Sequence, residues 1–255
     1  MTPVGLLNSD VAARARAWRN AGHAAICDVV EPWAHGTVVR ATPYPSYFDF
    51  NVVRVEENPA MSVEALVAFA DEALAGLAHR RIDFDLVDAA EPLRAGFEAK
   101  GWKASRLVWM RHEASLPPGP DLAVEEVPYD AVGDLRVAWH REDFPDQDST
   151  GYLAQAREVS LHRGARVLAI RDGGAPVAFA QLEREGAAAE ITQVYVRPDY
   201  RGAGRGTAIT RAAIEAAGDA RDLWIVADDE GWPKGLYARL GFRPAWATIE
   251  FLLPP

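Results

Sequence analysis

The chain has 255 residues, of which 49% are hydrophobic and 25% charged, a balance that excludes disorder, collagen and coiled coil as its main state. Its net charge of −10 argues against nucleic acid as a partner, because phosphate binding needs a basic surface, and is compatible with an amine substrate. The single cysteine, Cys27, excludes an intrachain disulfide and a cysteine-built metal site, so we expect no metal.

The chain shows no signal peptide and no apolar run near the ~20 residues that cross a bilayer. We therefore expect a cytoplasmic protein without a membrane partner, and its oligomeric state stays open.

The first half alternates helical and strand patterns. An apolar helical face begins after Ser62, which is a suitable N-cap. Helices are expected over residues 10–21, 63–77 and 92–100, and strands over 37–41, 47–55, 82–87 and 105–111.

A break follows at residues 112–120, where three prolines and a glycine end any helix or central strand. A long loop within one domain would show the same composition. We predict a linker between two domains, residues 1–115 and 121–255.

The second half reads as an α/β domain around a mixed sheet. Asp172-Gly173-Gly174 supplies the positive φ of a hairpin turn, and Gly218 and Gly241 end helices. Strands are expected over 122–127, 166–171, 176–183, 187–196, 223–227 and 245–253, and helices over 129–141, 151–161, 207–217 and 232–240.

A faint repeat relates the halves at an offset of 140 residues or one more. Strand, helix, glycine, aromatic and strand recur in the same order, so we favour duplication over chance. The matching segments are 97–103 with 237–243, 84–88 with 224–228, and 53–55 with 194–196.

The most informative stretch joins an apolar strand to a helix through Arg201-Gly202-Ala203-Gly204-Arg205-Gly206. Glycines let a ligand approach the backbone, and the free N–H groups of a helix start attract phosphate. The stretch fits neither a P-loop, which needs a lysine, nor the dinucleotide fingerprint, because Thr207 stands at its last glycine. Its residues predict an anion site, with a plain glycine-rich connection as the alternative.

Arg201, Gly204 and Gly206 meet the pattern R/Q-x-x-G-x-G/A, and Tyr237-Ala-Arg-Leu-Gly241-Phe242 follows downstream. This combination resembles the coenzyme A loop and a second hallmark of the GNAT N-acetyltransferase superfamily. The resemblance covers roughly residues 121–253 and implies two tandem GNAT-like domains, each a mixed, mostly antiparallel sheet flanked by helices.

The resemblance implies acetyl-CoA as acyl donor, with the pyrophosphate on the N–H groups from Arg201 to Thr207. The family's strand splays from its neighbour, and the donor's arm lies in that gap against the strand's backbone. The implied cofactor-binding residues are Val194, Tyr195, Val196, Arg201, Gly202, Ala203, Gly204, Arg205, Gly206 and Thr207.

In the family an amine attacks the thioester directly. Tyr237 matches the acid that assists the leaving thiolate, and its alternative role is packing on the sheet. Glu190 matches the strand position of a base, although an acidic strand end is common and many relatives use ordered water instead. Glu230 stands where the family often has asparagine, which puts that contact in doubt.

The family's substrate determinants lie at the junction of its first two helices, here residues 139–148. Four acids, Glu142, Asp143, Asp146 and Asp148, form either a rim that selects cations or a solvated loop. A lone histidine on a helix, such as His140, is more often a packing or surface residue than a base.

The first half departs from the family at the loop position. Residues 56–62 have no glycine and no arginine, and Glu56 and Glu57 would repel pyrophosphate. We therefore expect a degenerate half without a cofactor loop.

The sequence predicts transfer of an acetyl group to a primary amine of a small molecule or peptide. The alternatives are a non-catalytic acyl-CoA-binding sensor or scaffold, and transfer of a longer acyl group.

Overall fold

The computed structural model describes residues 9–255, which form two compact units. Within these residues, unit 1 comprises 9–109, 228–231 and 244–255, and unit 2 comprises 110–227 and 232–243. The units are therefore interleaved in sequence, because the end of the chain belongs to unit 1. The predicted division into a degenerate and a catalytic domain stays a prediction, and its first eight residues lie outside the described part.

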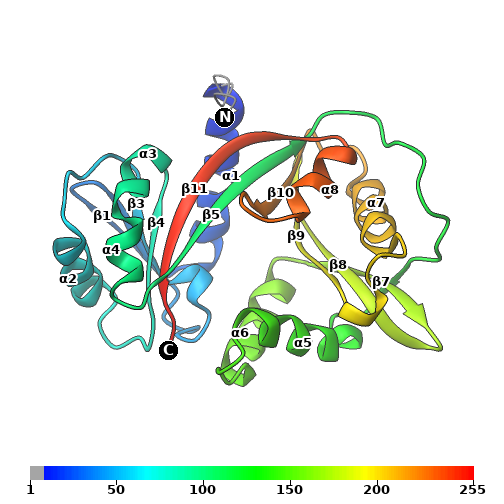
Figure 1. The fold of residues 1–255 in the computed structure, drawn as a ribbon, viewed down its shortest axis with the longest axis horizontal. Helices are drawn as coiled ribbons and strands as arrows, with labels where there is room; N and C mark the ends of the chain where they lie inside the picture. The colour runs from blue at the N-terminus through cyan, green and yellow to red at the C-terminus, as the bar shows by residue number, and fades with distance from the viewer. Residues whose placement is uncertain (1–8) are drawn as a thin grey trace. The chain divides into compact units, whose positions relative to one another are not determined.

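Unit 1 contains a mixed, mostly antiparallel sheet (Figure 1). Neighbouring strands pair antiparallel except β3 and β4, which are parallel. In spatial order the strands are β1 (Val29–Trp33), β2 (Gly36–Arg40), β3 (Val52–Val55), β4 (Arg80–Phe84) and β11 (Phe242–Leu253).

Helix α2 (Val63–Ala73) begins where its sequence pattern predicts, and the Ser62 side chain accepts a hydrogen bond from the Ala65 amide at 3.3 Å. It packs on one face of the sheet in a core that also includes Phe97 and Phe251, stacked with ring centroids 4.1 Å apart. The remaining helices of unit 1 are α1 (Ser9–Ile26), α3 (Val87–Ala90), α4 (Arg94–Glu98) and the short η1 (Phe48–Phe50) and η2 (Glu91–Leu93).

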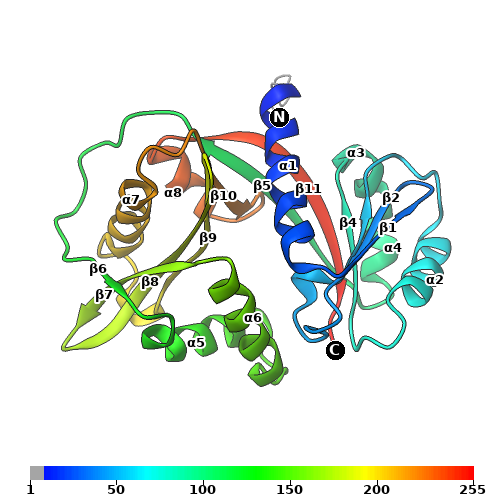
Figure 2. The same cartoon turned by 180° about the vertical axis from the view of Figure 1, so that it is seen from behind.

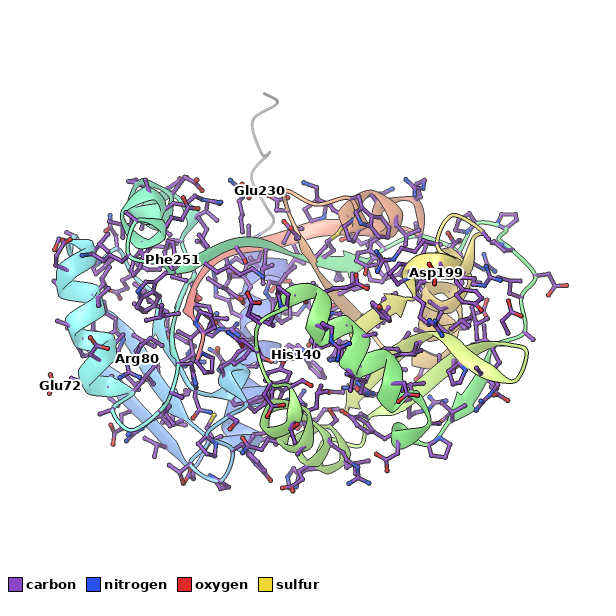
Figure 3. The ribbon with its side chains drawn as sticks, turned by 60° about the horizontal axis from the view of Figure 1, so that its bottom comes forward. Glu72, Arg80, His140, Asp199, Glu230 and Phe251 are labelled. Atoms are coloured by element: carbon purple, nitrogen blue, oxygen red, sulfur yellow. The ribbon has the colours of Figure 1, made fainter. Side chains whose placement is uncertain are left out.

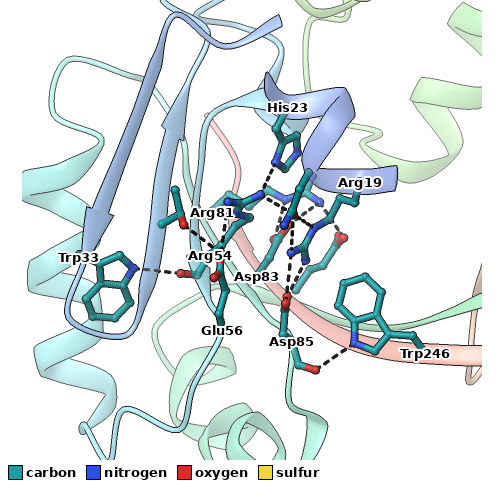
Figure 4. A network of polar contacts seen from close by, with 12 residues as sticks. Arg19, His23, Trp33, Arg54, Glu56, Arg81, Asp83, Asp85 and Trp246 are labelled. Atoms are coloured by element: carbon teal, nitrogen blue, oxygen red, sulfur yellow. Dashed lines mark hydrogen bonds and ion pairs between the residues drawn. The ribbon is translucent and has the colours of Figure 1, made fainter. Parts of the chain in front are cut away.

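The other face of the unit 1 sheet carries buried charges, because alternate residues of β3 and β4 are polar (Figure 4). Arg19 of α1 donates to Asp85 at 2.6 Å, and Arg81 donates to Asp83 at 2.8 Å. These charges are paired, as buried charges must be. The network therefore holds α1 on the sheet.

Unit 2 is built on the same plan. Its strands, in spatial order, are β10 (Asp222–Asp228), β9 (Ala188–Val196), β8 (Ala175–Glu185), β7 (Arg166–Asp172) and β6 (Glu125–Val127). Only β9 and β10 are parallel. Both units thus confirm the predicted fold class.

Helices cover both faces of the unit 2 sheet (Figure 2). On one face, α5 (Gly133–Asp143) packs over a core that includes Phe179 and Tyr195. On the other face, α7 (Arg205–Ala217) packs against β7, β8 and β9. The other helical segments are α6 (Thr150–His162), α8 (Pro233–Arg239), η3 (Tyr129–Val132) and η4 (Pro198–Tyr200). Strand β5 (Lys103–His112) begins in unit 1 and ends in unit 2, because unit 2 starts at Met110.

Three sequence expectations for unit 1 were wrong in detail. The predicted strand 47–55 contains η1 before β3, and the strand predicted at 82–87 lies at Arg80–Phe84. Strand β1 was missed because its residues Val29–Trp33 include a proline and show no buried alternation. Because β4 ends at Phe84, residues 84–88 do not form a strand, whereas the matched residues 224–228 lie in β10. The offset of 140 residues between the halves is therefore not kept at this strand.

Among residues 9–255, no helix is long and apolar enough to cross a membrane.

Candidate cofactor and active site

The parallel strands β9 and β10 separate part-way along their length. Their pairing runs from Ala188 opposite Asp222 to Ile191 opposite Ile225. Beyond that point β9 continues to Val196 and β10 to Asp228 without further paired residues. The two strands therefore leave a gap between their carboxyl-terminal ends.

Strand β9 turns the backbone groups of two residues toward this gap. The Arg197 amide donates to the Val177 carbonyl at 3.0 Å, on the β8 side. Because backbone groups of successive residues alternate in direction, those of Val194 and Val196 face β10 instead. These are the groups that the family resemblance assigns to the donor's arm.

A β-bulge lies where the strands separate. Gln181 of β8 stands opposite Gln193, whereas its neighbour Leu182 stands opposite Ile191, so Thr192 is an extra residue in β9. The Thr192 hydroxyl is buried and has no hydrogen-bond partner within the described chain. Such a group fits a bound polar ligand, and bulges are frequent beside active sites. Thr192 was not predicted as a site residue, because nothing in the surrounding sequence indicates the bulge.

The glycine loop ends in the N-terminus of α7. Gly202 and Gly204 have φ of +82° and +77°, which other residues rarely adopt. The first helical bond runs from the Ala208 amide to the Gly204 carbonyl at 2.9 Å, so the N–H groups of residues 205–207 have no helical partner. This arrangement suits an anion, as predicted.

Side chains would obstruct this loop at one point. A Cβ atom on Gly204 would lie 2.7 Å from the Pro120 side chain. A Cβ on Gly206 would lie 3.5 Å from Leu236 of α8, which brings α8 beside the loop. The loop therefore needs glycine at residue 204 for space as well as conformation.

Arg201 is anchored to its surroundings. Its Nε donates to the Val196 carbonyl at 2.9 Å, and its Nη2 donates to Glu142 at 2.7 Å. Arg205 likewise donates to the Tyr200 carbonyl at 3.3 Å, and Asp199 lies in the same turn (Figure 3). Both arginines thus fix the loop's shape in addition to lending it charge.

Glu142 links this loop to strand β9. Its carboxylate accepts from the Tyr195 hydroxyl at 2.5 Å as well as from Arg201. Burial and the neighbouring carboxylate raise the pKa of Tyr195 to about 12. Although burial opposes ionisation of Glu142, these two hydrogen bonds lower its pKa.

Two of the four acids at the junction of the first two helices accept hydrogen bonds within the chain. Glu142 is committed to Tyr195 and Arg201. Asp148 accepts from the amide and hydroxyl of Thr150 at 3.0 and 2.7 Å, which makes it a local cap. Sequence spacing shows which carboxylates are close, but not which are already paired.

The expected acid, Tyr237, lies buried on α8, with its ring 6.2 Å from that of Phe242. Burial raises its pKa, so the phenol stays protonated and able to donate. The expected base, Glu190, lies on β9 one residue before the pairing with β10 ends. It stands opposite Glu183 of β8 and is half-buried.

Two further candidates have other partners. Glu230, at the family's asparagine position, belongs to unit 1 and pairs with Arg94 at 3.2 Å. His140 is buried on α5 against Phe144 and Tyr152 (Figure 3), and burial lowers its pKa. Its position is that of a packing residue.

The described residues contain no group of three or more His, Cys, Asp and Glu side chains that could hold a metal ion.

Comparison with known families accounts for this geometry. Residues 163–244 match the model of the acetyltransferase (GNAT) domain. The chain contains a GNAT domain. No curated protein matches the chain.

Solved structures resemble the whole chain. A functionally unknown conserved protein from Staphylococcus epidermidis ATCC 12228 has a TM-score of 0.68 at 16% identity, covering 89% of this chain and 93% of that one. A GCN5-related N-acetyltransferase from Kribbella flavida has a TM-score of 0.60 at 19% identity, covering 96% of each. A putative GNAT-family acetyltransferase from Novosphingobium aromaticivorans DSM 12444 has a TM-score of 0.58 at 16% identity, covering 93% and 95%.

These likenesses extend over both halves of the chain, so the whole chain shares the fold of these structures. The GNAT match itself contains β7 to β10, the glycine loop and Tyr237.

Proposed function

We propose that this protein is an acetyl-CoA-dependent N-acetyltransferase whose acceptor is a primary amine of a small molecule or peptide. The observation that carries the proposal is the gap between β9 and β10, which opens beside a glycine loop at a helix start. The gap offers the backbone groups of Val194 and the amide of Val196 to an extended arm, since the Val196 carbonyl accepts from Arg201. The loop offers N–H groups to a pyrophosphate.

The catalytic roles are assigned from the two proton transfers that the reaction needs. The amine must lose a proton, and the departing thiolate must be stabilised or protonated. Glu190, at the closed end of the gap, is the proposed base, acting directly or through a water. Tyr237, whose pKa is raised by burial, is the proposed proton donor toward the thiolate.

Unit 1 lacks both features. Its parallel pair β3 and β4 stays joined to the last residue of β3, where Val55 stands opposite Phe84. The amides that follow β3 are also engaged: those of Glu56 and Glu57 donate to the His35 carbonyl at 2.8 and 3.3 Å. We propose that this unit binds no acetyl-CoA.

The test is release of free thiol from acetyl-CoA across a panel of amines. Amine-dependent release that is lost in a folded Glu190→Gln, Tyr237→Phe double variant supports the proposal. Tight acetyl-CoA binding with no release for any amine would instead identify a sensor or scaffold.

A further inference from the structure

A buried polar network lies on the α5 face of the unit 2 sheet and bears on the acceptor. At its centre is Arg136 of α5, which is 3% exposed. Its guanidinium lies 3.8 Å from the ring centroid of Tyr129 and 4.8 Å from that of Phe179. This enclosure fixes the direction of its N–H groups.

Two glutamine carbonyls receive those N–H groups. Nη2 donates to Oε1 of Gln181 at 2.8 Å, and Nη1 donates to Oε1 of Gln193. Because an arginine can only donate, both amides must turn their oxygens toward it. The orientation of each amide group is therefore decided by chemistry.

The Gln181 amide is satisfied at both ends. Its Nε2 donates to Glu183 at 3.0 Å and to Ser160 at 3.2 Å, and Glu183 is paired with Arg163. Gln181 is consequently a structural member of the network.

Gln193 differs, because only its oxygen is used. Within residues 9–255 its Nε2 has no hydrogen-bond partner, and the side chain is half-buried. Two N–H bonds are thus held in a fixed direction by Arg136 and left for a ligand.

The position of Gln193 places these donors at the acceptor side of the gap. It follows the bulge at Thr192, and its partner Gln181 lies two residues from Glu183, which stands opposite Glu190. Gln193 and Glu190 therefore share the α5 face of the sheet. The opposite face is covered by α7, which packs against β7, β8 and β9. An amine approaching Glu190 must come from the side on which Gln193 lies.

We infer that Gln193 is a specificity residue whose amide donates to a neutral carbonyl oxygen close to the acceptor amine, as in an α-amino amide or a peptide N-terminus. Glu190 on the same face disfavours a carboxylate, whereas Glu183 is already paired with Arg163. A neutral carbonyl oxygen suits the neutral amide donor of Gln193. This inference rests on the proposed N-acetyltransferase function.

The test uses two acceptors of the same shape, glycinamide and 2-methylpropylamine, which differ in the carbonyl and amide groups. The kcat/KM of each is measured for the wild type, Gln193→Leu and the control Gln181→Leu, which alters the same network but removes no free donor. Wild type should prefer glycinamide, and Gln193→Leu should lower its kcat/KM ~10-fold or more while leaving 2-methylpropylamine unchanged. Gln181→Leu should keep the wild-type preference.

Three results would overturn the inference. A wild type without preference, or a Gln193→Leu variant that loses both amines equally, contradicts it while leaving acetyl transfer intact. The absence of thiol release with either amine contradicts it too, and the amine panel then shows whether acetyl transfer as such has also failed.

Discussion

Val55 stands opposite Phe84 at the very end of β3, so the parallel pair of unit 1 is closed along its length. The Asp85 amide donates to the Val55 carbonyl at 2.9 Å and extends this closure by one more bond. In unit 2 the corresponding pair stops at Ile191 and Ile225. The same strand plan is thus closed in one unit and open in the other, which is the basis for assigning the cofactor to unit 2.

Replacing Tyr237 by phenylalanine should lower kcat by ~10²-fold, the size typical of one acid–base group, and leave acetyl-CoA affinity nearly unchanged. Tyr237 is buried, and phenylalanine keeps the same aromatic ring at that position, so the variant should still fold. Steady-state rates under conditions where chemistry limits turnover, with affinity measured separately, check this. An unchanged kcat would remove Tyr237 from the mechanism.

Gly204→Ala should weaken acetyl-CoA binding more than Gly202→Ala does. Both residues have positive φ and share the cost of that conformation, roughly 1 kcal/mol. Only at Gly204 does a Cβ meet another atom, the Pro120 side chain at 2.7 Å, whereas nothing lies within 4 Å at Gly202. Calorimetric affinities of the two variants provide the comparison, and equal losses would show that Pro120 does not constrain the loop.

Tyr195 and Glu142 should be energetically coupled. A double-mutant cycle with Tyr195→Phe and Glu142→Gln should give a coupling of ~1 kcal/mol in unfolding free energy, since the hydrogen bond ends on a charged group. The contribution from Arg201 is smaller because that pair is solvent-exposed. Additive losses in denaturant melts would mean that the contact does not stabilise the domain.

The pKa of Glu142 is lowered in the folded state. Its contribution to the unfolding free energy should therefore be fully present at pH values above the ordinary carboxyl pKa. That contribution should be lost as the pH falls through the lowered pKa of the folded state.

Acid should destabilise unit 1 through His79. This side chain is 1% exposed, and burial lowers its pKa to about 4 from 6.5. The unfolded chain therefore takes up a proton at a pH where the folded chain does not, and the unfolding free energy falls between pH 6.5 and 4 by at most ~3 kcal/mol. His79→Phe should flatten the pH dependence in that window; identical slopes in the two proteins would contradict it.

Sequence patterns predicted the elements of unit 2 well because their signals are local. Helices α7 and α8 end before Gly218 and Gly241, which have positive φ, as the sequence predicts. In unit 1 the same kind of local signal, Ser62, caps α2. In contrast, β1 was not predicted, because Val29–Trp33 contains a proline. The assignment of β11 to unit 1 depends on long-range pairing with β4, which no local pattern contains.

The site divides in the same way. The glycine loop and Tyr237 belong to short motifs and could be proposed from the sequence, whereas Thr192 and Gln193 depend on a bulge and on Arg136 of a distant helix. The pairing of Glu142 with Arg201 likewise joins residues far apart in the chain, so the sequence did not predict it.

Calorimetric titration of the intact chain with acetyl-CoA tests the central claim most directly. The closed strands of unit 1 and the open strands of unit 2 predict a stoichiometry near one, and Gly204→Trp should abolish binding in a protein that still melts cooperatively. Two equivalent sites, or binding retained by the folded Gly204→Trp variant, would contradict the assignment of the cofactor to unit 2.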